Sequence, residues 1–368
     1  MKILMVITGL GIGGAERQVI DLAERLSQLG STVKIAYLTG PVLVQPIMHN
    51  IELIPLHAEK SVLGLFYAKR RLVALVNGFR PDVVHSHMVH ANLLARLARI
   101  FSKRTRLVCT AHSTDEGGRL RMLAYRVTDP LADLSTNVSA QAVAQFRRKG
   151  AVPSGKMIPV SNGIDTQKFK YDVIARRQIR SQYCALESQV IVAVGRLHEA
   201  KDYPNLIRAF LVVSQNVPKA CLWIVGEGHL RSSLERLISD LGVSNKVMLF
   251  GSRHDISSIL SAADVFVLSS AWEGFGLSVA EAMAAERVIV ATDCGGVAEV
   301  LGNAGFIVPP QDSARLAGSL TKALQLTEQE AYAYGVRARE RVTELFSLDS
   351  VVDKWVRIYR NPKEFLPK

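Results

Sequence analysis

The first half of the chain alternates short apolar runs with longer amphipathic stretches. Each apolar run has the length and composition of a buried strand, and the stretch after it repeats its apolar positions every three or four residues. This alternation is typical of a parallel sheet that is covered by helices on both faces. It predicts strands at residues 3–8, 34–38, 83–87 and 107–110, and helices at residues 15–29, 67–77 and 91–101.

The same alternation starts again in the second half. It predicts strands at residues 190–194, 221–225, 246–250, 265–268 and 288–291, and helices at residues 204–213, 230–241, 255–262 and 279–285. Two Rossmann-like units in tandem fit this pattern. The Asn162-Gly163 dipeptide is a strong turn signal near the join. We therefore expect an N-terminal domain of residues 1–165, a C-terminal domain of residues 166–346, and a last segment, residues 347–368, with a helix at residues 348–359.

Composition agrees with two globular domains. The chain has 368 residues, of which 48% are hydrophobic and 21% charged, so each domain can bury its own core. The sequence holds no run of about 18 apolar residues, which would indicate a transmembrane helix. Its opening stretch, MKILMVITGLGIGGA, fits a buried strand entering a glycine loop better than a secretory signal. The four cysteines lie far apart, which favours free thiols and a cytoplasmic location.

The net charge of +12 is concentrated in the first half. Residues 1–165 contain 21 Lys and Arg against 11 Asp and Glu, whereas residues 166–368 contain 24 against 22. The cations form four clusters: Lys69 to Arg71; Arg96, Arg99, Lys103, Arg104 and Arg106; Arg119, Arg121 and Arg126; and Arg147 to Lys149. No helix-turn-helix, zinc pattern or aromatic-rich basic strand accompanies them, so we expect no nucleic-acid partner. An anionic membrane surface is the partner that this charge favours, on the inner face of the plasma membrane.

The most informative stretch is AWEGFGLSVAEAMAAE, residues 271–286. Glu273 and Glu281 lie eight positions apart, with a strand-like run before them, a glycine-punctuated turn between them and a helical run after it. Two glutamates at this spacing are by themselves ordinary in a solvated helix. A turn that opens a helix, however, presents free N–H groups that suit a diphosphate. Carboxylates on both sides could accept hydrogen bonds from hydroxyls, and a nucleotide sugar carries both kinds of group.

This stretch resembles the signature of the retaining glycosyltransferases of family 4, which have the GT-B fold. The resemblance runs in order and spacing from Gly9 to about Phe346. It implies an α/β protein with two Rossmann-like domains that face each other across a cleft, and a last helix that crosses back to the first domain. It also implies that N–H groups at Gly276, Leu277 and Ser278 hold the diphosphate of a nucleotide-sugar donor.

The glycine loop at residues 9–14 has two interpretations. Gly9, Gly11 and Gly14 have the spacing of a dinucleotide-binding loop, but that site needs an acid at the end of the second strand, and Thr39 stands there instead. The longer string GGAERQVIDLA resembles the first loop of family 4 transferases. By that resemblance Gly14 approaches the donor diphosphate, because a residue without a side chain lets the backbone come close.

Arg196 and Lys201 lie in the turn after the first strand of the second half. As an isolated pair they could be ordinary surface cations, but two cations at this place can also neutralise a diphosphate leaving group. Their context, GRLHEAKDYPNLIRAF, resembles the phosphate-binding segment of the family. Asp202 stands where the family usually has glycine, and it adds a negative charge beside Lys201.

Four histidines fall near the third and fourth strands. His85 and His87 face the same side of a strand and His90 follows, so a zinc site is an alternative, but a fourth ligand is missing. The chain also has no Asp-x-Asp pair, and we expect no metal ion and no cofactor. By resemblance, His112 matches the histidine that lies near the transferred sugar. A loop histidine satisfied by its neighbours is the other interpretation.

Three further features come from the second half. Arg253, in the loop after a strand, is expected either to contact the base or to face solvent. The glycine turn within residues 292–299 is expected to shape the pocket. Glu286 stands where the family usually has a glycine in left-handed conformation, and keeping that turn would cost roughly 1 kcal/mol.

Together with the missing Asp-x-Asp pair, the resemblance to family 4 implies a retaining, metal-independent hexosyltransferase of polysaccharide or lipopolysaccharide synthesis. Its expected donor is a UDP-sugar, and its expected acceptor is a hydroxyl of a glycan or of a polyprenyl-diphosphate-linked glycan. In the implied mechanism Arg196 and Lys201 hold the leaving diphosphate, Glu281 binds the ribose, and Glu273 and His112 contact the transferred sugar. The alternatives are a nucleotide-sugar isomerase or hydrolase of similar fold, and a non-catalytic nucleotide-sugar-binding subunit.

Overall fold

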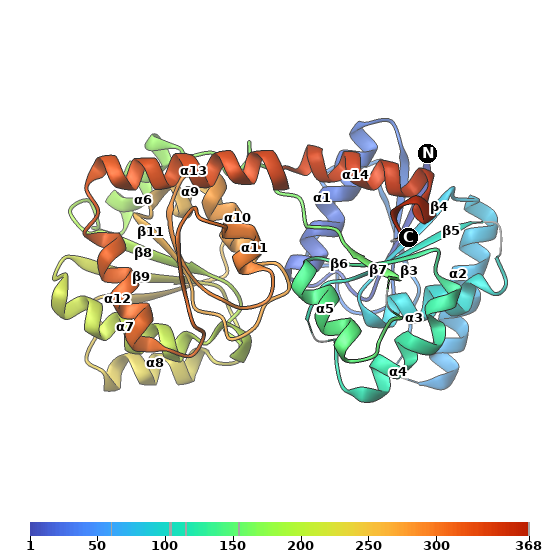
Figure 1. Ribbon diagram of the computed structural model, residues 1–368, viewed down its shortest axis with the longest axis horizontal. Coiled ribbons are helices and arrows are strands. Elements are labelled where there is room, and N and C mark those ends of the chain that lie inside the picture. The colour runs from blue at the N-terminus through green and yellow to red at the C-terminus, as the bar shows by residue number, and fades with distance from the viewer. Residues whose placement is uncertain (60, 103–104, 115, 154, 367–368) are drawn as a thin grey trace. The chain divides into compact units, whose positions relative to one another are not determined.

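The computed structural model describes residues 1–59, 61–102, 105–114, 116–153 and 155–366. The chain divides into two compact units (Figure 1). The first comprises Met1–Gly163 and Leu348–Lys368, and the second comprises Ile164–Ser347. Each unit contains one parallel sheet between helices, which is the α/β class predicted from the alternation of apolar runs.

The sheet of the first unit has seven parallel strands in the order β3-β2-β1-β4-β5-β6-β7. The strands are β1 (Lys2–Ile7), β2 (Thr32–Tyr37), β3 (Glu52–Pro55), β4 (Val83–His87), β5 (Arg106–Ala111), β6 (Leu134–Asn137) and β7 (Met157–Pro159). From β1 the chain builds the sheet outward through β2 and β3, and from β4 it builds in the opposite direction. The strand order therefore reverses between β1 and β4, and in parallel sheets ligands bind at the carboxyl ends of the strands at such a point.

Helices cover both faces of this sheet. They are α1 (Gly14–Gln28), α2 (Val62–Phe79), α3 (Val89–Arg99), α4 (Arg119–Thr128), α5 (Ala140–Arg148) and α14 (Leu348–Arg360). Alternate side chains of β1 point to opposite faces: Ile3 and Met5 pack in the core formed with α1 and α14, whereas Leu4 and Val6 pack in the core formed with α2 and α3. Trp355 of α14 is buried in the first of these cores, so the C-terminal helix is part of this unit.

The sheet of the second unit has six parallel strands in the order β10-β9-β8-β11-β12-β13. They are β8 (Gln189–Val194), β9 (Ala220–Val225), β10 (Val247–Gly251), β11 (Val265–Leu268), β12 (Val288–Thr292) and β13 (Phe306–Val308). The order reverses between β8 and β11. All four residues of β11 are buried, as expected for a central strand with helices on both faces.

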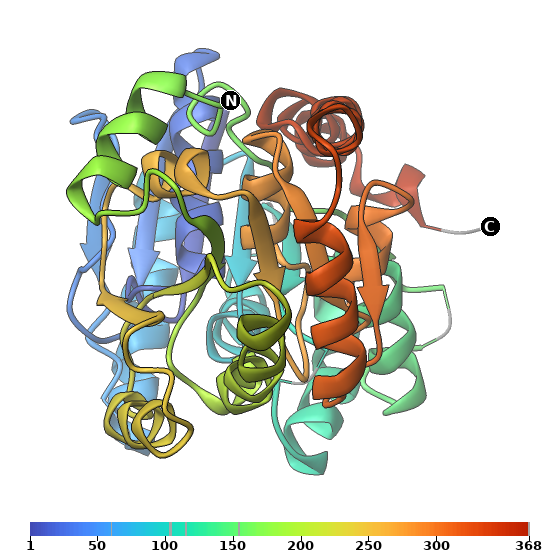
Figure 2. The same ribbon diagram turned by 90° about the vertical axis from the view of Figure 1, so that its left-hand side faces the viewer.

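The helices of the second unit form a layer on each side of the sheet. They are α6 (Val173–Gln182), α7 (Tyr203–Asn216), α8 (Arg231–Asp240), α9 (Ile256–Ala262), α10 (Leu277–Ala284), α11 (Val297–Leu301), α12 (Ser313–Leu324) and α13 (Glu328–Phe346). Figure 1 shows α7, α8 and α12 on one face and α6, α9 and α13 on the other. Figure 2 shows α12, in orange-red, lying against the strands.

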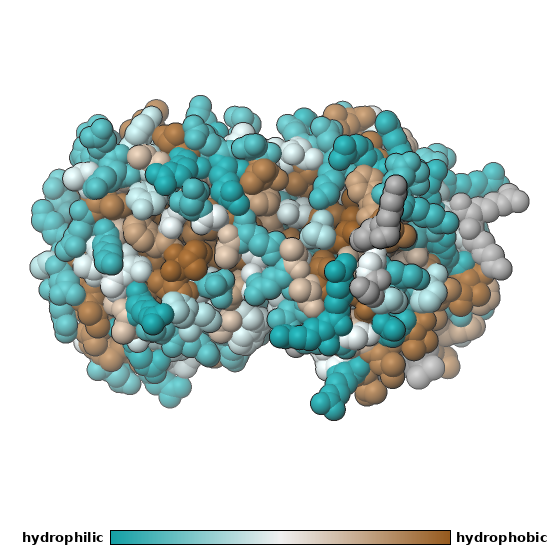
Figure 3. Space-filling model, viewed as in Figure 1, coloured by the Kyte–Doolittle hydropathy of each residue, from teal (hydrophilic) through white to brown (hydrophobic). Residues whose placement is uncertain are grey.

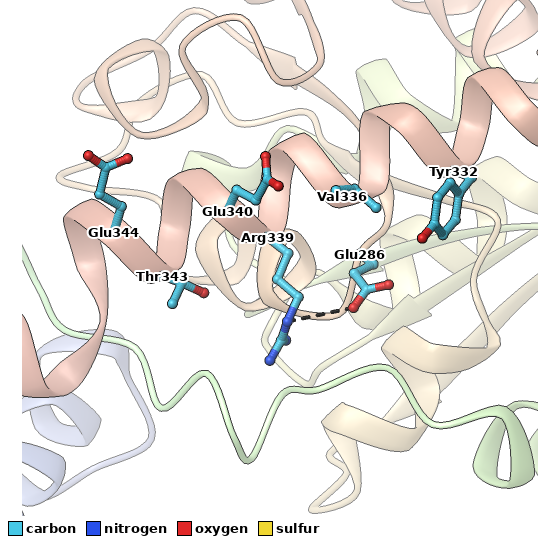
Figure 4. Close-up of a pocket in the computed structure, with 7 residues that line it drawn as sticks. All are labelled: Glu286, Tyr332, Val336, Arg339, Glu340, Thr343 and Glu344. Atoms are coloured by element: carbon cyan, nitrogen blue, oxygen red, sulfur yellow. Dashed lines mark ion pairs between the residues drawn. The ribbon is translucent and has the colours of Figure 1, made fainter.

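The turn after α10 keeps the left-handed conformation although its residue is not glycine. Glu286 has a φ of 60°. Arg339 of α13 forms an ion pair with its carboxylate at 3.6 Å and also donates to the carbonyl of Ala284 (Figure 4). A Cβ on Gly335 would lie 2.4 Å from the Glu286 carbonyl oxygen, so α13 packs directly on this turn. The backbone strain, roughly 1 kcal/mol, is therefore offset by contacts with α13.

Two cations of the cluster at residues 96–106 are paired with acidic side chains. Arg96 is fully buried, pairs with Asp129 at 3.3 Å and donates to the Ser135 hydroxyl at 2.9 Å. Arg99 pairs with Asp133 through both guanidinium nitrogens. Both bind these acids because α3 turns the two arginines toward the segments that follow it. Lys103 and Arg104 lie outside the described residues. Across the described part of the chain, no helix has the length and apolarity needed to cross a membrane.

Candidate active site

The reversal of strand order in the second unit brings together two loops that are far apart in sequence. The loop after β8 carries Lys201, and the loop after β11 carries Glu273. β8 and β11 are neighbours in the sheet, and the chain leaves them toward opposite sides. Their carboxyl ends therefore border the crevice in which such sheets bind ligands.

Lys201 and Glu273 form a direct ion pair across this point. The Lys201 ammonium lies 2.5 Å from Glu273 Oε1, and the same oxygen accepts a hydrogen bond from the Ser270 hydroxyl at 2.9 Å. The two side chains are 20% and 16% exposed, so the pair is shielded but open to a ligand. A Cβ on Gly195 would lie 2.6 Å from Lys201 Cε, which explains why the lysine needs a glycine beside its aliphatic stem.

The turn that carries Glu273 is held by the glycine turn after β12. Gly295 has a φ of 58°, and a Cβ there would lie 1.9 Å from the Glu273 carbonyl oxygen. The Gly296 N–H donates to the Gly274 carbonyl at 3.1 Å, and the Thr292 hydroxyl donates to the Ser270 carbonyl at 2.7 Å. This segment, residues 292–296, thus fixes the backbone on which Glu273 stands.

Helix α10 begins directly after this turn and has no side-chain cap. Its N-cap residue is Gly276 in the left-handed conformation (φ 87°), so the N-cap position itself offers no side chain to the N–H groups of the first turn. The Ser278 hydroxyl is buried and has no hydrogen-bond partner in the described residues. Free N–H groups, the helix dipole and an unpaired hydroxyl together favour an anion at Gly276, Leu277 and Ser278. Glu281, one turn further along α10, is half-buried.

The two predicted arginines differ in how they are held. Arg196 is exposed, directly follows Gly195 and has no ion pair among the described residues. Arg253, after β10, is bound by the Asp255 carboxylate at 2.8 and 2.6 Å and by the Tyr183 hydroxyl at 3.2 Å. The hydrogen bonds to Asp255 raise the pKa of Arg253. Arg253 can therefore offer a base mainly the face of its guanidinium group, because Asp255 and Tyr183 occupy its edge.

The first unit contains three neighbouring histidines, of which His85 and His87 are buried and His112 is half-buried. Nε2 of His112 lies 3.0 Å from Nδ1 of His87, and the ring of His87 stacks near that of His85 with centroids 3.9 Å apart. Both ring nitrogens of His85 are engaged, by the Tyr359 hydroxyl and the Thr110 hydroxyl at 2.7 Å each. Since His85 has no free lone pair for a metal, the zinc alternative loses one of its ligands. The described residues also contain no cluster of three or more His, Cys, Asp or Glu side chains that could hold a metal ion.

Burial keeps these histidines neutral. It lowers the pKa of His112 to about 4, and it lowers the pKa of His85 and of His87 well below the usual value, with repulsion from neighbouring histidines as the second cause. The other nitrogen of His112, Nδ1, is buried without a partner in the described residues. A neutral imidazole with one unpaired nitrogen can exchange a single hydrogen bond with a hydroxyl.

The glycine loop of the first unit follows β1, at that unit's own reversal of strand order. Gly13 is the N-cap of α1 in extended conformation, so the N-cap position itself offers no side chain to the helix that begins at Gly14. A Cβ on Gly13 would lie 2.4 Å from a carboxylate oxygen of Glu16. The predicted donor-binding residue Gly14 is thus the first residue of an uncapped helix.

Sequence reasoning missed three side chains that support the site. Tyr203 is buried and donates to the Gly195 carbonyl at 3.0 Å, and burial and then Glu273 raise the pKa of its hydroxyl. Ser270 binds Glu273, as described above. Glu116 accepts hydrogen bonds from the His112 N–H at 3.0 Å and from the Tyr125 hydroxyl. Ser270 could have been found by its place after β11, but nothing in the sequence marks Tyr203 or Glu116.

A hollow of about 490 Å³ lies elsewhere in the second unit. It runs along α13 between Tyr332 and Glu344 and is bordered by Glu286 (Figure 4). Glu286 lies two residues before the start of β12, so this hollow lies at the amino end of the strands. It is separate from the carboxyl edge that carries Lys201 and Glu273, and we assign it no role in the chemistry.

Known proteins share both halves of the chain. The family model described as Glycosyltransferase Family 4 matches residues 12–168, and that described as Glycosyl transferases group 1 matches residues 176–341. EpsD of Bacillus subtilis (strain 168), a glycosyltransferase by name, is 30% identical over 261 residues, which are 67% of this chain and 68% of EpsD. The UDP-Gal:α-D-GlcNAc-diphosphoundecaprenol α-1,3-galactosyltransferase of Escherichia coli is 25% identical over 334 residues, or 86% of this chain and 82% of that protein.

A solved structure shows the same architecture. The crystal structure of HepE from Anabaena in complex with UDP-glucose superposes with a TM-score of 0.86 at 22% identity, covering 98% of this chain and 99% of HepE. At 22% sequence identity, this similarity supports a shared fold and nothing further. It confirms the predicted class of two Rossmann-like domains.

Proposed function

Because this chain belongs to glycosyltransferase family 4, we propose that it transfers a hexose from a nucleoside-diphosphate sugar to a hydroxyl of a glycan acceptor. We further propose that the anomeric configuration is retained and that no metal ion takes part. The observation that carries the proposal is the Lys201–Glu273 pair at the strand reversal of the second unit. It sets a cation and a carboxylate side by side where a sugar diphosphate would need both.

The leaving diphosphate would be held by three kinds of donor. Arg196 is an exposed cation without an ion pair among the described residues, and Lys201 keeps two N–H donors beyond the one given to Glu273. The uncapped first turn of α10 adds N–H groups at Leu277 and Ser278. Losing one preorganised donor of this kind typically costs about 3 kcal/mol, or roughly 100-fold in rate. Positive charge from side chains would make a metal ion unnecessary for leaving-group stabilisation.

The remaining residues would bind hydroxyls. Glu281 would accept hydrogen bonds from the ribose, and Glu273 would accept them from the transferred sugar and offset positive charge at its anomeric carbon. His112 would exchange one hydrogen bond with that sugar through its unpaired Nδ1. The acceptor hydroxyl would attack from the face that the diphosphate leaves, and its proton would pass to the departing phosphate. Gly14 would bring an uncapped helix start to the donor, and Arg253 would lie against the base.

The acceptor we propose is a glycan carried on a polyprenyl diphosphate, with UDP as the donor's nucleotide. Two facts support this choice. The galactosyltransferase of Escherichia coli that is similar to this chain is named for a diphosphoundecaprenol-linked sugar and for UDP-Gal. The first 165 residues also carry a large excess of cations, which suits an anionic membrane surface. Such an acceptor would place the protein at the cytoplasmic face of the plasma membrane.

A thermal-shift panel tests the donor site. Wild type would be melted in EDTA with UDP, GDP, ADP or NAD, beside Arg196→Ala and the control Arg236→Ala. Arg236 is an exposed arginine on α8 whose guanidinium donates to the Ser232 carbonyl of its own helix and has no ion pair among the described residues. We expect UDP to stabilise wild type and the control, and to stabilise Arg196→Ala much less.

Turnover then separates the alternatives. We expect sugar transfer only in the presence of acceptor, retained configuration of the product by NMR, and a loss of about 100-fold in rate for Glu273→Gln. Stabilisation by NAD alone would point to a dinucleotide enzyme. Consumption of the UDP-sugar without acceptor would indicate a hydrolase or isomerase, and binding without any turnover would indicate a non-catalytic subunit.

A further inference from the structure

Three helices of the first unit expose apolar side chains on neighbouring faces. Six large apolar side chains on these elements are exposed. They are Phe66 and Tyr67 of α2, Leu97 of α3, Phe101 just after α3, and Leu120 and Leu123 of α4. Leu97 and Phe101, and likewise Leu120 and Leu123, have the spacing of one helical face, whereas Phe66 and Tyr67 are adjacent residues of α2. We call these six residues the α2–α4 face.

Contacts join these elements into one surface. The Lys69 ammonium lies 5.2 Å from the centroid of the Phe66 ring and 4.7 Å from that of the Phe101 ring, so it links α2 to the end of α3. α3 packs against both α2 and α4. Figure 3 shows hydrophobic residues, in brown, gathered at the lower right, where Figure 1 places α2 and α4. Contiguous apolar surface of this kind marks a place of interaction.

The three helices of the α2–α4 face carry charge of a single sign. Helices α2, α3 and α4 together contain eight Lys and Arg and no Asp or Glu. Two of the eight, Arg96 and Arg99, are paired inward, but Arg70 on α2 and Arg119 and Arg126 on α4 are exposed. Exposed apolar side chains bordered by cations are the pattern of helices that lie in the interface of an anionic membrane.

We propose that the α2–α4 face docks this protein on an anionic lipid bilayer, with its apolar side chains inserted among the lipid headgroups. The α2–α4 face of a second copy fits less well, because a two-fold contact would set cations against cations. The proposal deepens the proposed function, since a polyprenyl-linked acceptor lies at such a surface. It also goes further than charge attraction alone, because insertion predicts binding that survives salt.

Vesicle flotation tests the proposal. Wild type would be mixed with vesicles of phosphatidylcholine alone or with phosphatidylglycerol, at about 50 and about 500 mM NaCl. The variant is Leu120→Asp/Leu123→Asp, at positions 84% and 58% exposed, where the folded unit should tolerate a charge. The matched control is Val173→Asp/Ile174→Asp on α6 of the second unit, at positions 64% and 67% exposed.

We expect wild type and the control to float with anionic vesicles and to keep part of this binding at high salt. The Leu120/Leu123 variant should lose at least about tenfold in partitioning at both salt concentrations. Its melting temperature and its stabilisation by UDP should match wild type. Those two readouts show that the variant is folded and that its second unit is intact.

Three results would overturn the proposal. The first is no wild-type binding to anionic vesicles, and the second is equal binding by the Leu120/Leu123 variant and wild type. The third is a concentration-dependent dimer, seen by light scattering, that this variant abolishes, since the face would then bind a second copy. Failure of the proposed function has a different signature: UDP would not stabilise wild type although the protein still floats with anionic vesicles.

Discussion

Replacing Gly295 by alanine should disable the site without changing any side chain proposed to touch the donor. A Cβ at this position would lie 1.9 Å from the Glu273 carbonyl oxygen, and side-chain Cβ atoms essentially never come closer to another atom than 3.0 Å. One of the two backbone segments must therefore move by about 1 Å or more. Because the oxygen belongs to Glu273 itself, this movement displaces its carboxylate relative to Lys201.

The size of the effect follows from that displacement. A misplacement of about 1 Å at a reacting centre typically costs roughly 100-fold in rate. Inserting a methyl group into a filled space costs about 1–3 kcal/mol, which corresponds to a fall of several degrees in the melting temperature of a domain this size. We therefore expect Gly295→Ala to remain folded at 25 °C while its kcat falls about 100-fold.

Gly242→Ala is the matched control. Gly242 lies in the same unit with a φ of 68°, but a Cβ there has no atom within 4 Å. It carries the same left-handed strain of about 1 kcal/mol without the clash. Initial rates of sugar transfer and melting temperatures would be measured for both variants. Activity of Gly295→Ala within about threefold of Gly242→Ala would refute the reasoning, because the close contact would then not position Glu273.

Three further predictions concern stability. Glu286→Gly removes left-handed backbone strain of roughly 1 kcal/mol, but it also removes the partly exposed ion pair with Arg339. We therefore expect a small net rise in melting temperature, measured by calorimetry. A fall in melting temperature would contradict this expectation. The pKa of His112 is 6.5 in the unfolded chain and about 4 in the folded unit. As the pH falls from 6.5 to 4, protonation of the unfolded chain should therefore lower the unfolding free energy by up to about 1.4 kcal/mol per pH unit. Chemical denaturation of His112→Asn at several pH values should show a shallower dependence of the unfolding free energy on pH. Lys201→Ala leaves Glu273 without its cation, and we expect the free energy of unfolding to fall by about 1–2 kcal/mol. The double variant Lys201→Ala/Glu273→Gln should recover part of this loss. If the effects of the two single substitutions simply add in the double variant, the two side chains are not coupled.

Most of the long strands and several of the long helices were predicted, because each shows a full apolar strand or several turns of helix. The strands Val83–His87 and Val265–Leu268 were predicted to the residue, and the helix of residues 348–359 was predicted within one residue. The edge strands β3, β7 and β13 and strand β6 were missed, since three or four residues carry too little periodicity. Helices α4, α5, α6, α11, α12 and α13 were also missed. In α13 the solvent-exposed face is highly charged, and only Gly335, Ala338, Val342 and Phe346 are buried.

Prediction of the site was limited by contacts between distant segments. The glycines were visible in the sequence because positions with positive φ or no room for a Cβ, such as Gly276 and Gly295, select glycine on local grounds. Which distant side chain a residue will contact cannot be predicted from the residues next to it in the sequence. Tyr359 binds His85 across 274 positions, and Arg96 turns inward to Asp129 although its neighbours in sequence suggested a surface cluster.

The Lys201–Glu273 pair shows how the two kinds of information combine. Each residue was recognisable from its own motif, but the motifs lie 72 positions apart and only the strand order makes them neighbours. The contact also constrains the proposed chemistry. An ammonium group has three N–H donors and Glu273 takes one, so two are left for phosphate oxygens. Glu273 in turn is held by both Lys201 and Ser270, which fixes its carboxylate before any sugar arrives. A carboxylate that is oriented in advance stabilises developing positive charge without reorganising. In the proposed mechanism, Lys201 would therefore bind the diphosphate and would also position the carboxylate that stabilises positive charge on the transferred sugar.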